Sequence, residues 1–168
     1  CVEEGLIAKP LSSETLTKTS KEYFSFVWKL YYEMQMPMLL GFKKVYGDLE
    51  SFHVHGICLI NHALNSKRND NSEMSKEFYL EKYFFADKKD FSGVNAMSIS
   101  EITGIPRATV IRKLNILLKE KFLTIDSKKH YSITGVHQKK ILNVQKNTLN
   151  NLSKFSARIY NLSLMKDN

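Results

Sequence analysis

The chain of 168 residues has few of the residues that form turns, with only seven glycines and three prolines. A fold of many short strands needs frequent turns, so this scarcity favours helices. Cysteine is also scarce, because Cys1 and Cys58 are the only two and they form no CxxC pair. Neither a disulfide framework nor a cysteine-built zinc site is indicated, and we expect a reducing, cytoplasmic setting. No apolar run approaches the roughly 18 residues that a membrane span needs, so no membrane partner is expected.

Acidic residues are scarce in the second part of the chain. Residues 105–168 contain 13 Lys and Arg but only three Asp and Glu, a net charge of +10, whereas residues 1–104 have a net charge of −2. A polyanion would be attracted to the basic part, and release of its counterions would add affinity. A solvated basic surface explains the charge equally well. The aromatic residues have the opposite distribution, since 15 of the 19 Phe, Tyr and Trp precede residue 92.

The spacing of apolar residues predicts helices in the first half of the chain. From Ser20 to about Tyr46 they recur every three to four residues, and Pro37 should kink this helix or split it in two. Residues 1–20 are polar and are predicted to form a loose arm or a short capping segment. A second helix is expected over residues 49–64 and a polar linker over residues 65–72. A third helix should follow over residues 74–85 and a charged loop over residues 87–95.

Residues 98–134 contain the pattern with the clearest functional content. Ser98 and Glu101 have the spacing of a capping box, so a short helix is predicted to begin at Ser98. Gly104 can adopt the positive φ of a tight turn, and Pro106 suits the first turn of a following helix, where its missing N–H costs nothing. A helix, a glycine turn and a second helix form the plan of a helix-turn-helix.

The second of these helices, residues 106–120, is predicted to be amphipathic at about 100° per residue. Its apolar side is formed by Val110, Leu114, Leu117 and the stem of Lys121, with Ile111 and Leu118 at the edges. Its opposite side is formed by Ala108, Thr109, Arg112, Asn115 and Lys119. Arg107 projects from the N-terminal end, which enters the major groove in helix-turn-helix proteins, and this polar chemistry matches base and phosphate readout. An ordinary amphipathic helix with a wet, basic face is the alternative.

Two β-prone runs follow this helix directly, over residues 122–125 and 131–134. Residues 126–130 join them, so the sequence predicts a short β-hairpin with a cationic tip. A wing requires this placement, because its tip must reach the phosphates or the minor groove beside the recognition helix.

With this hairpin, residues 98–134 resemble the winged helix-turn-helix of bacterial transcriptional regulators. The string from Ser98 to Leu114 is similar to the IclR pattern. Four of its residues stand where that pattern has them: Pro106, Thr109, Val110 and Arg112. The arrangement of flanking helices is similar to that of the MarR family, although the hairpin lacks the Asp-x-Arg element usual there. The resemblance covers about 40 of the 168 residues, and residues 65–95 look like an insertion relative to that family.

The resemblance implies a mainly α-helical fold with a small β-hairpin wing, in which a winged helix-turn-helix is flanked by N- and C-terminal dimerisation helices. It implies a helical dimerisation or sensor region over residues 1–92, a DNA-binding domain over residues 93–134 and a C-terminal dimerisation helix over residues 135–168. The residues expected to contact DNA come from both helices and the wing: Ser98, Ser100, Arg107, Ala108, Thr109, Arg112, Lys113, Asn115, Lys128, Lys129 and His130.

The function implied is sequence-specific binding of double-stranded DNA by a homodimer that regulates transcription. The alternative is a winged-helix module for protein assembly or replication initiation. The sequence has no Gly-rich phosphate loop, no HExxH motif and no nucleophile elbow, so neither an enzyme nor a cofactor is expected.

The final helix is predicted to begin at Gly135 and to reach about Lys166. It carries an apolar stripe at alternating spacings of four and three: Thr148, Leu152, Phe155, Ile159 and Leu162. Such a stripe needs a partner helix, either in the first half of the chain or in a second subunit. A dimer is favoured because two recognition helices about one DNA turn apart bind more tightly than one.

Two groups in the first half have an ordinary and a functional interpretation. His55, Cys58 and His62 share one helix face at spacings that could bind a metal, but histidines packed beside a buried thiol are the ordinary interpretation. A cluster of aromatic and methionine residues could line a pocket for a small-molecule effector, or could simply pack between helices: Phe24, Trp28, Tyr31, Tyr32, Met34, Met36 and Met38.

Overall fold

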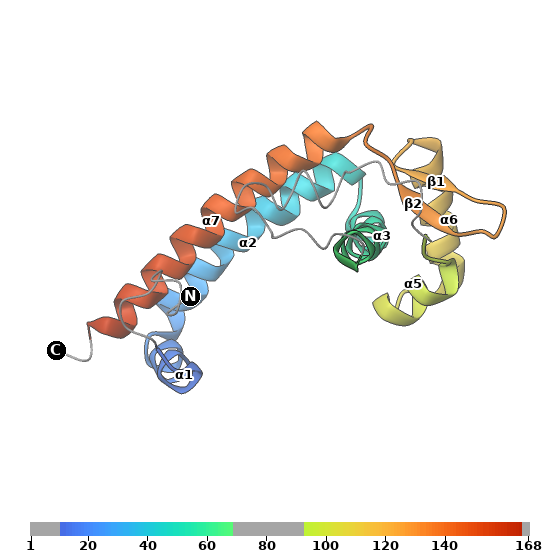
Figure 1. Ribbon diagram of the computed structural model, residues 1–168. Coiled ribbons are helices and arrows are strands. Elements are labelled where there is room, and N and C mark those ends of the chain that lie inside the picture. The colour runs from blue at the N-terminus through green and yellow to red at the C-terminus, as the bar shows by residue number, and fades with distance from the viewer. Residues whose placement is uncertain (1–10, 69–92, 166–168) are drawn as a thin grey trace. The chain divides into compact units, whose positions relative to one another are not determined.

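The computed structural model describes residues 11–68 and 93–165. This part of the chain is mainly helical and contains a small antiparallel hairpin (Figure 1). The chain forms two compact units, which we name the helical unit (residues 1–38 and 146–168) and the central unit (residues 39–145). Among the described helices, none combines the length and the apolar character that crossing a membrane requires.

The helices and strands, in chain order, are α1 (Ser13–Glu22), α2 (Phe24–Tyr46), α3 (Leu49–Arg68), α5 (Ala96–Thr103), α6 (Arg107–Lys119), β1 (Leu123–Ile125), β2 (Tyr131–Ile133) and α7 (Gln138–Leu164). The prediction of a mainly α-helical chain with a small β-hairpin is therefore confirmed. The helices predicted over residues 49–64, 106–120 and 135–166 correspond to α3, α6 and α7.

Four predictions about the first half differ from the structure or fall on residues outside the described ranges. Residues 13–22 form a helix rather than an arm, because the side chain of Ser12 caps it by accepting a hydrogen bond from the backbone N–H of Thr15 at 3.1 Å. Pro37 lies inside α2 and does not split it. Helix α3 includes residues 65–68 of the predicted linker, and the predicted helix 74–85 lies outside the described residues.

The core of the central unit lies where α3, α5, α6 and the hairpin contact one another. Helix α6 contributes the apolar side that its sequence predicts, since Val110, Leu114 and Leu117 are fully or almost fully buried. Burying each such side chain stabilises the fold by roughly 1.5–3 kcal/mol. The other core residues of the central unit are Phe42, Tyr46, Val54, Cys58, Leu59, Ile99, Phe122, Leu123, Tyr131, Ile141 and Leu142.

The hairpin pairs β1 with β2 in antiparallel register, with Leu123 opposite Ile133 and Ile125 opposite Tyr131. Leu123 and Tyr131 are buried and fix the hairpin to the core. Tyr131 also forms a β-bridge with Val94, in which Val94 N–H donates to Tyr131 O (3.1 Å) and Tyr131 N–H donates to Val94 O (2.9 Å). The segment before α5 therefore adds backbone hydrogen bonds to the far side of β2, which the sequence did not predict.

In the helical unit, α2 and α7 contact each other through Tyr31, whose ring lies edge-on to Phe155 at 6.5 Å, and through an ion pair of Glu33 with Arg158 at 3.1 Å. Aromatic rings continue along α2, where Trp28 stacks on Phe24 and on Tyr31. Several large apolar side chains of this unit are exposed: Phe24, Phe26, Trp28, Tyr32, Met36, Leu149 and Leu152.

A cavity of about 210 Å³ lies between α2 and α7 in the helical unit. Its lining is mixed in character: Leu30, Glu33, Met34, Asn151, Lys154, Phe155 and Arg158. Of the aromatic and methionine residues predicted as an effector pocket, Met34 is the member that lines it, while Phe24, Trp28, Tyr32 and Met36 are exposed. The predicted cluster therefore does not enclose this cavity.

Candidate nucleic-acid interface

The first helix of the pair, α5, begins two residues earlier than its sequence predicts. The cap is Asn95, whose side-chain oxygen accepts the backbone N–H of Ser98 at 3.0 Å. The predicted capping box of Ser98 and Glu101 is therefore wrong, since Ser98 is the donor in the capped turn. The physical reason is that Asn caps a helix as well as Ser does.

The turn between α5 and α6 has the geometry that Gly104 predicts. Gly104 adopts φ = 70° and ends α5, with its N–H donating to the carbonyl of Ser100 at 2.9 Å. The hydroxyl of Ser100 donates to the carbonyl of Ile105 at 2.7 Å, and the hydroxyl of Thr103 accepts from the N–H of Ile105 at 3.2 Å. Ser100, expected to contact DNA, therefore has its hydroxyl proton engaged inside the turn.

Helix α6 begins at Arg107, and its cap residue Pro106 makes no side-chain hydrogen bond to the first turn. The N–H groups of a first turn are orphan donors, and they attract anionic ligands. On the predicted polar side of α6, Ala108, Arg112, Asn115 and Lys119 face solvent and Thr109 is half-buried. Arg107 is exposed at the N-terminal end of the helix, so α6 exposes three cationic residues in all.

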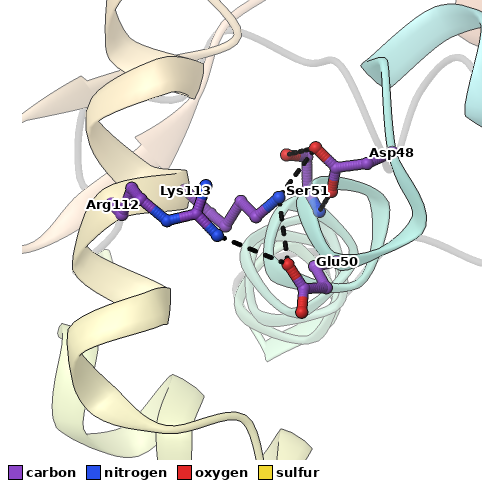
Figure 2. Close-up of polar contacts among 5 residues, drawn as sticks. All are labelled: Asp48, Glu50, Ser51, Arg112 and Lys113. Atoms are coloured by element: carbon purple, nitrogen blue, oxygen red, sulfur yellow. Dashed lines mark hydrogen bonds and ion pairs between the residues drawn. The ribbon is translucent and has the colours of Figure 1, made fainter.

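Lys113 belongs to the predicted DNA-contacting set but is buried, with a residue exposure of only 5%. Its ammonium lies 2.8 Å from Asp48 Oδ2 and 3.0 Å from Glu50 Oε2 (Figure 2). Burial alone would lower the pKa of Lys113, but the hydrogen bonds and the attraction of the two carboxylates outweigh it and raise that pKa. Lys113 thus joins α6 to the start of α3 and is not available to DNA.

The carboxylate of Asp48 contacts both Ser51 and Lys113. It accepts the backbone N–H of Ser51 at 2.7 Å and the hydroxyl of Ser51 at 3.0 Å, which caps α3. Burial would raise the pKa of Asp48, but the hydrogen bonds from Lys113 and Ser51 lower it overall. The carboxylate therefore serves the helix cap and the lysine together.

Arg112 lies next to this buried link and stays at the surface. Its Nη2 is 3.7 Å from Glu50 Oε2, the oxygen that also contacts Lys113, and its side chain is 62% exposed (Figure 2). One carboxylate on α3 thus contacts an inward lysine and an outward arginine on consecutive positions of α6.

The C-terminal end of α6 is closed by Lys121, which adopts φ = 60°. Its N–H donates to Leu118 O (3.0 Å), and the N–H of Phe122 donates to Leu117 O (2.8 Å), which is a Schellman motif. The predicted packing of the Lys121 stem on the apolar side of α6 is wrong, because the residue lies beyond the helix and is exposed.

Tyr46 and His55 form a buried pair beneath the start of the hairpin. The Tyr46 hydroxyl and His55 Nδ1 are 2.9 Å apart, and both rings pack against Phe122. Burial lowers the pKa of His55 to about 4, with a smaller contribution from the nearby His137. His137 itself stacks on Phe122 and lies with Nε2 2.7 Å from the carbonyl of Glu120.

The tip of the hairpin exposes Lys128 and Lys129, and His130 is half-buried beside them. The Asp126 side chain organises the tip by accepting the backbone N–H groups of Lys128 (2.9 Å) and His130 (2.8 Å), which lowers the pKa of Asp126. Lys129 adopts φ = 62°. Two exposed lysines thus stand on a fixed turn.

The metal-site alternative in α3 finds no support in residues 11–68 and 93–165, where no three His, Cys, Asp or Glu side chains are placed to hold a metal ion. His55 contacts Tyr46 instead. Cys58 is buried, and this burial raises its pKa to about 12, so the thiol packs as an apolar side chain.

Sequence reasoning missed Asp48 and Glu50. The signal available was slight: both follow the break at Gly47 and stand at the start of a helix, where acidic residues are common.

Comparison of the chain with protein-family models, with curated proteins and with solved structures found no match.

Proposed function

We propose that this protein is a winged helix-turn-helix regulator that binds specific double-stranded DNA sequences as a cytoplasmic homodimer. The observation that carries the proposal is the exposed polar surface of α6, with Arg112, Asn115 and Lys119 on the side opposite the buried leucines and Arg107 at the N-terminal end. Helix α6 would lie in the major groove, and the hairpin would contact the flanking backbone.

Three features support this assignment. The α5–α6 turn is fixed by Gly104 and by side-chain hydrogen bonds, so α6 is held at a defined angle to α5. The hairpin follows α6 directly and presents Lys128 and Lys129 at its tip. The charge of the segment after residue 104 attracts a polyanion.

The second candidate is a module that binds another protein through the same surface. It is favoured by Ile111 and Ile116 on α6, which are more than a third exposed beside the cationic residues. An interface with a protein would bury these side chains, whereas DNA readout depends on the arginines.

Selection of bound sites from a random duplex pool distinguishes the two candidates. We expect an inverted repeat whose half-sites are about one helical turn apart, as two symmetry-related recognition helices require. A pool that shows no enrichment after repeated rounds would contradict DNA readout and favour the protein-binding module.

Arg107→Ala and Arg112→Ala are expected to weaken binding to the selected duplex more than binding to a scrambled duplex. An arginine that reads a base contributes about 1–3 kcal/mol of discrimination. Fluorescence anisotropy with both duplexes measures this, and Lys18→Ala removes an exposed charge on α1 as the matched control. Equal losses on both duplexes would assign the two arginines to phosphate contact.

Removal of the charges at the hairpin tip is expected to weaken binding to all duplexes equally. We would combine Lys128→Ala with Lys129→Asn, because asparagine tolerates the positive φ of residue 129. The slope of log affinity against log salt should fall by roughly one unit for each lost phosphate contact. An unchanged slope would show that the hairpin tip does not contact DNA.

Leu152→Asp is expected to weaken the proposed homodimer at least roughly tenfold, since a charge would enter an apolar interface. Leu152 belongs to the predicted stripe of α7 and is 43% exposed, so the change spares the core of the helical unit. Asn150→Asp places the same charge at another exposed position of α7 and is the matched control. Sedimentation velocity measures the oligomeric state of both variants. A Leu152→Asp variant that remains dimeric would place the interface elsewhere.

A further inference from the structure

We infer that Glu50, which belongs to α3 and not to the proposed recognition helix, positions Arg112 and thereby sets how well the protein discriminates between DNA sequences. This inference rests on the DNA-binding function proposed above. It concerns a carboxylate that sequence reasoning does not associate with DNA.

The carboxylate of Glu50 is held in place by a buried group. Lys113 Nζ lies 3.0 Å from Glu50 Oε2, and the Lys113 side chain is only 6% exposed, so this ammonium cannot turn away to solvent. Asp48 holds the same ammonium at 2.8 Å while capping α3 through Ser51. One oxygen of the half-exposed Glu50 carboxylate is therefore tied to a buried ammonium beside the start of α3.

Arg112 occupies the outer side of the same carboxylate. The separation of 3.7 Å between Arg112 Nη2 and Glu50 Oε2 is that of an ion pair rather than a hydrogen bond. A guanidinium has five N–H donors in a planar fork, so this attraction draws the group toward Glu50 and leaves its donors for a ligand. Figure 2 shows both cationic side chains extending from α6 toward α3.

Two physical effects follow from this arrangement. A long side chain loses rotational freedom when it binds, and a neighbouring carboxylate that orients it in advance removes part of that loss. The same carboxylate repels phosphates, so it weakens binding to every duplex by a similar factor. The first effect favours the correct sequence relative to all others, whereas the second cancels when the affinities for two duplexes are compared.

Glu50→Gln tests the inference because glutamine keeps the size of the side chain and an oxygen that can accept from Lys113. We would measure Kd by fluorescence anisotropy for a duplex selected from a random pool and for a scrambled duplex of the same composition. The Kd for the scrambled duplex divided by the Kd for the selected duplex is expected to fall roughly fivefold. This is the lower end of what an arginine–base contact contributes. Affinity for the scrambled duplex should stay equal or rise slightly.

Asp48→Asn is the matched control, since Asp48 pairs with Lys113 while Arg112 pairs with Glu50. Asparagine caps a helix as well as aspartate does, so α3 should remain intact. The ratio of Kd values should then stay at the wild-type value. A decrease as large as that of Glu50→Gln would show that the effect runs through Lys113 and helix packing, which overturns the inference.

A double variant provides the last arm. In an Arg112→Ala background, Glu50→Gln should cause no further change in the ratio, whereas an equal change in both backgrounds would mean that Glu50 acts without Arg112. If the wild type discriminates and Glu50→Gln leaves its ratio unchanged, this inference is wrong and DNA binding stands. If the wild type binds neither duplex, or both equally, the proposed function fails and the inference with it.

Discussion

Lowering the pH from 7 to 4 should decrease the free energy of unfolding by roughly 3 kcal/mol through the buried imidazole of His55 alone. The pKa of His55 is lowered to about 4 in the folded protein, from its ordinary value of 6.5. The unfolded chain therefore binds a proton between pH 6.5 and pH 4 while the folded protein does not. Protonation favours the unfolded chain throughout this window, and below pH 4 both states are protonated.

Burial of the His55 ring is the main cause of this preference for the neutral form. The nearby His137 adds to it, whereas a backbone hydrogen bond at Phe122 opposes it. The Tyr46 hydroxyl lies 2.9 Å from Nδ1, and the Phe122 ring lies edge-on to the imidazole. Asp48 and Asp126 affect the free energy of unfolding over a different range of pH. The pKa of each is lowered from 3.8, so their contribution is lost only as the pH falls below that value.

Urea unfolding at a series of pH values measures the effect, and His55→Gln should flatten the profile between pH 7 and pH 4. His53→Gln removes an exposed imidazole from the same helix and serves as the matched control. If His55→Gln cannot fold, Tyr46→Phe keeps the ring buried and should retain the steep profile. A His55→Gln profile as steep as that of the wild type would contradict the assignment to His55.

The elements that local pattern determines could be predicted from the sequence. The period of Val110, Leu114 and Leu117 identifies the buried side of α6, and the two β-prone runs around Asp126 identify the hairpin. Gly104 adopts a positive φ in the tight turn, as expected of a glycine between two predicted helices. Each of these depends on residues within about one or two turns of the chain.

Contacts that depend on distant residues could not be predicted in this way. Lys113 falls between the polar and apolar sides of a helical projection, and its burial depends on two carboxylates brought to it by α3. An exposed lysine and a buried, paired one have the same local sequence signal. The set of DNA-contacting residues predicted from sequence therefore includes Lys113, which is buried, and does not include Glu50, which pairs with it.

The bridge between Val94 and Tyr131 is a second contact of this kind, and Gly93 makes it possible. A Cβ atom at position 93 would lie 2.5 Å from the backbone oxygen of Tyr131 and 2.7 Å from Ser132 Oγ. The Tyr131 oxygen cannot move aside, because it accepts the N–H of Val94 at 3.1 Å. Only glycine allows the two backbones to approach this closely.

Gly93→Ala is therefore expected to destabilise the protein by about 2–3 kcal/mol, through the steric conflict and the loss of the backbone hydrogen bonds of the bridge. Urea unfolding measures the loss, and Gly135→Ala is the matched control because its Cβ would meet nothing within 4 Å. Amide exchange gives a local test, since the Tyr131 N–H donates to Val94 O at 2.9 Å and should lose protection. A Gly93→Ala variant that keeps wild-type stability and a protected Tyr131 amide would show that β2 is not bridged by this segment. The hairpin would then be held to the core by side chains such as Phe122, Leu123 and Tyr131, which are buried.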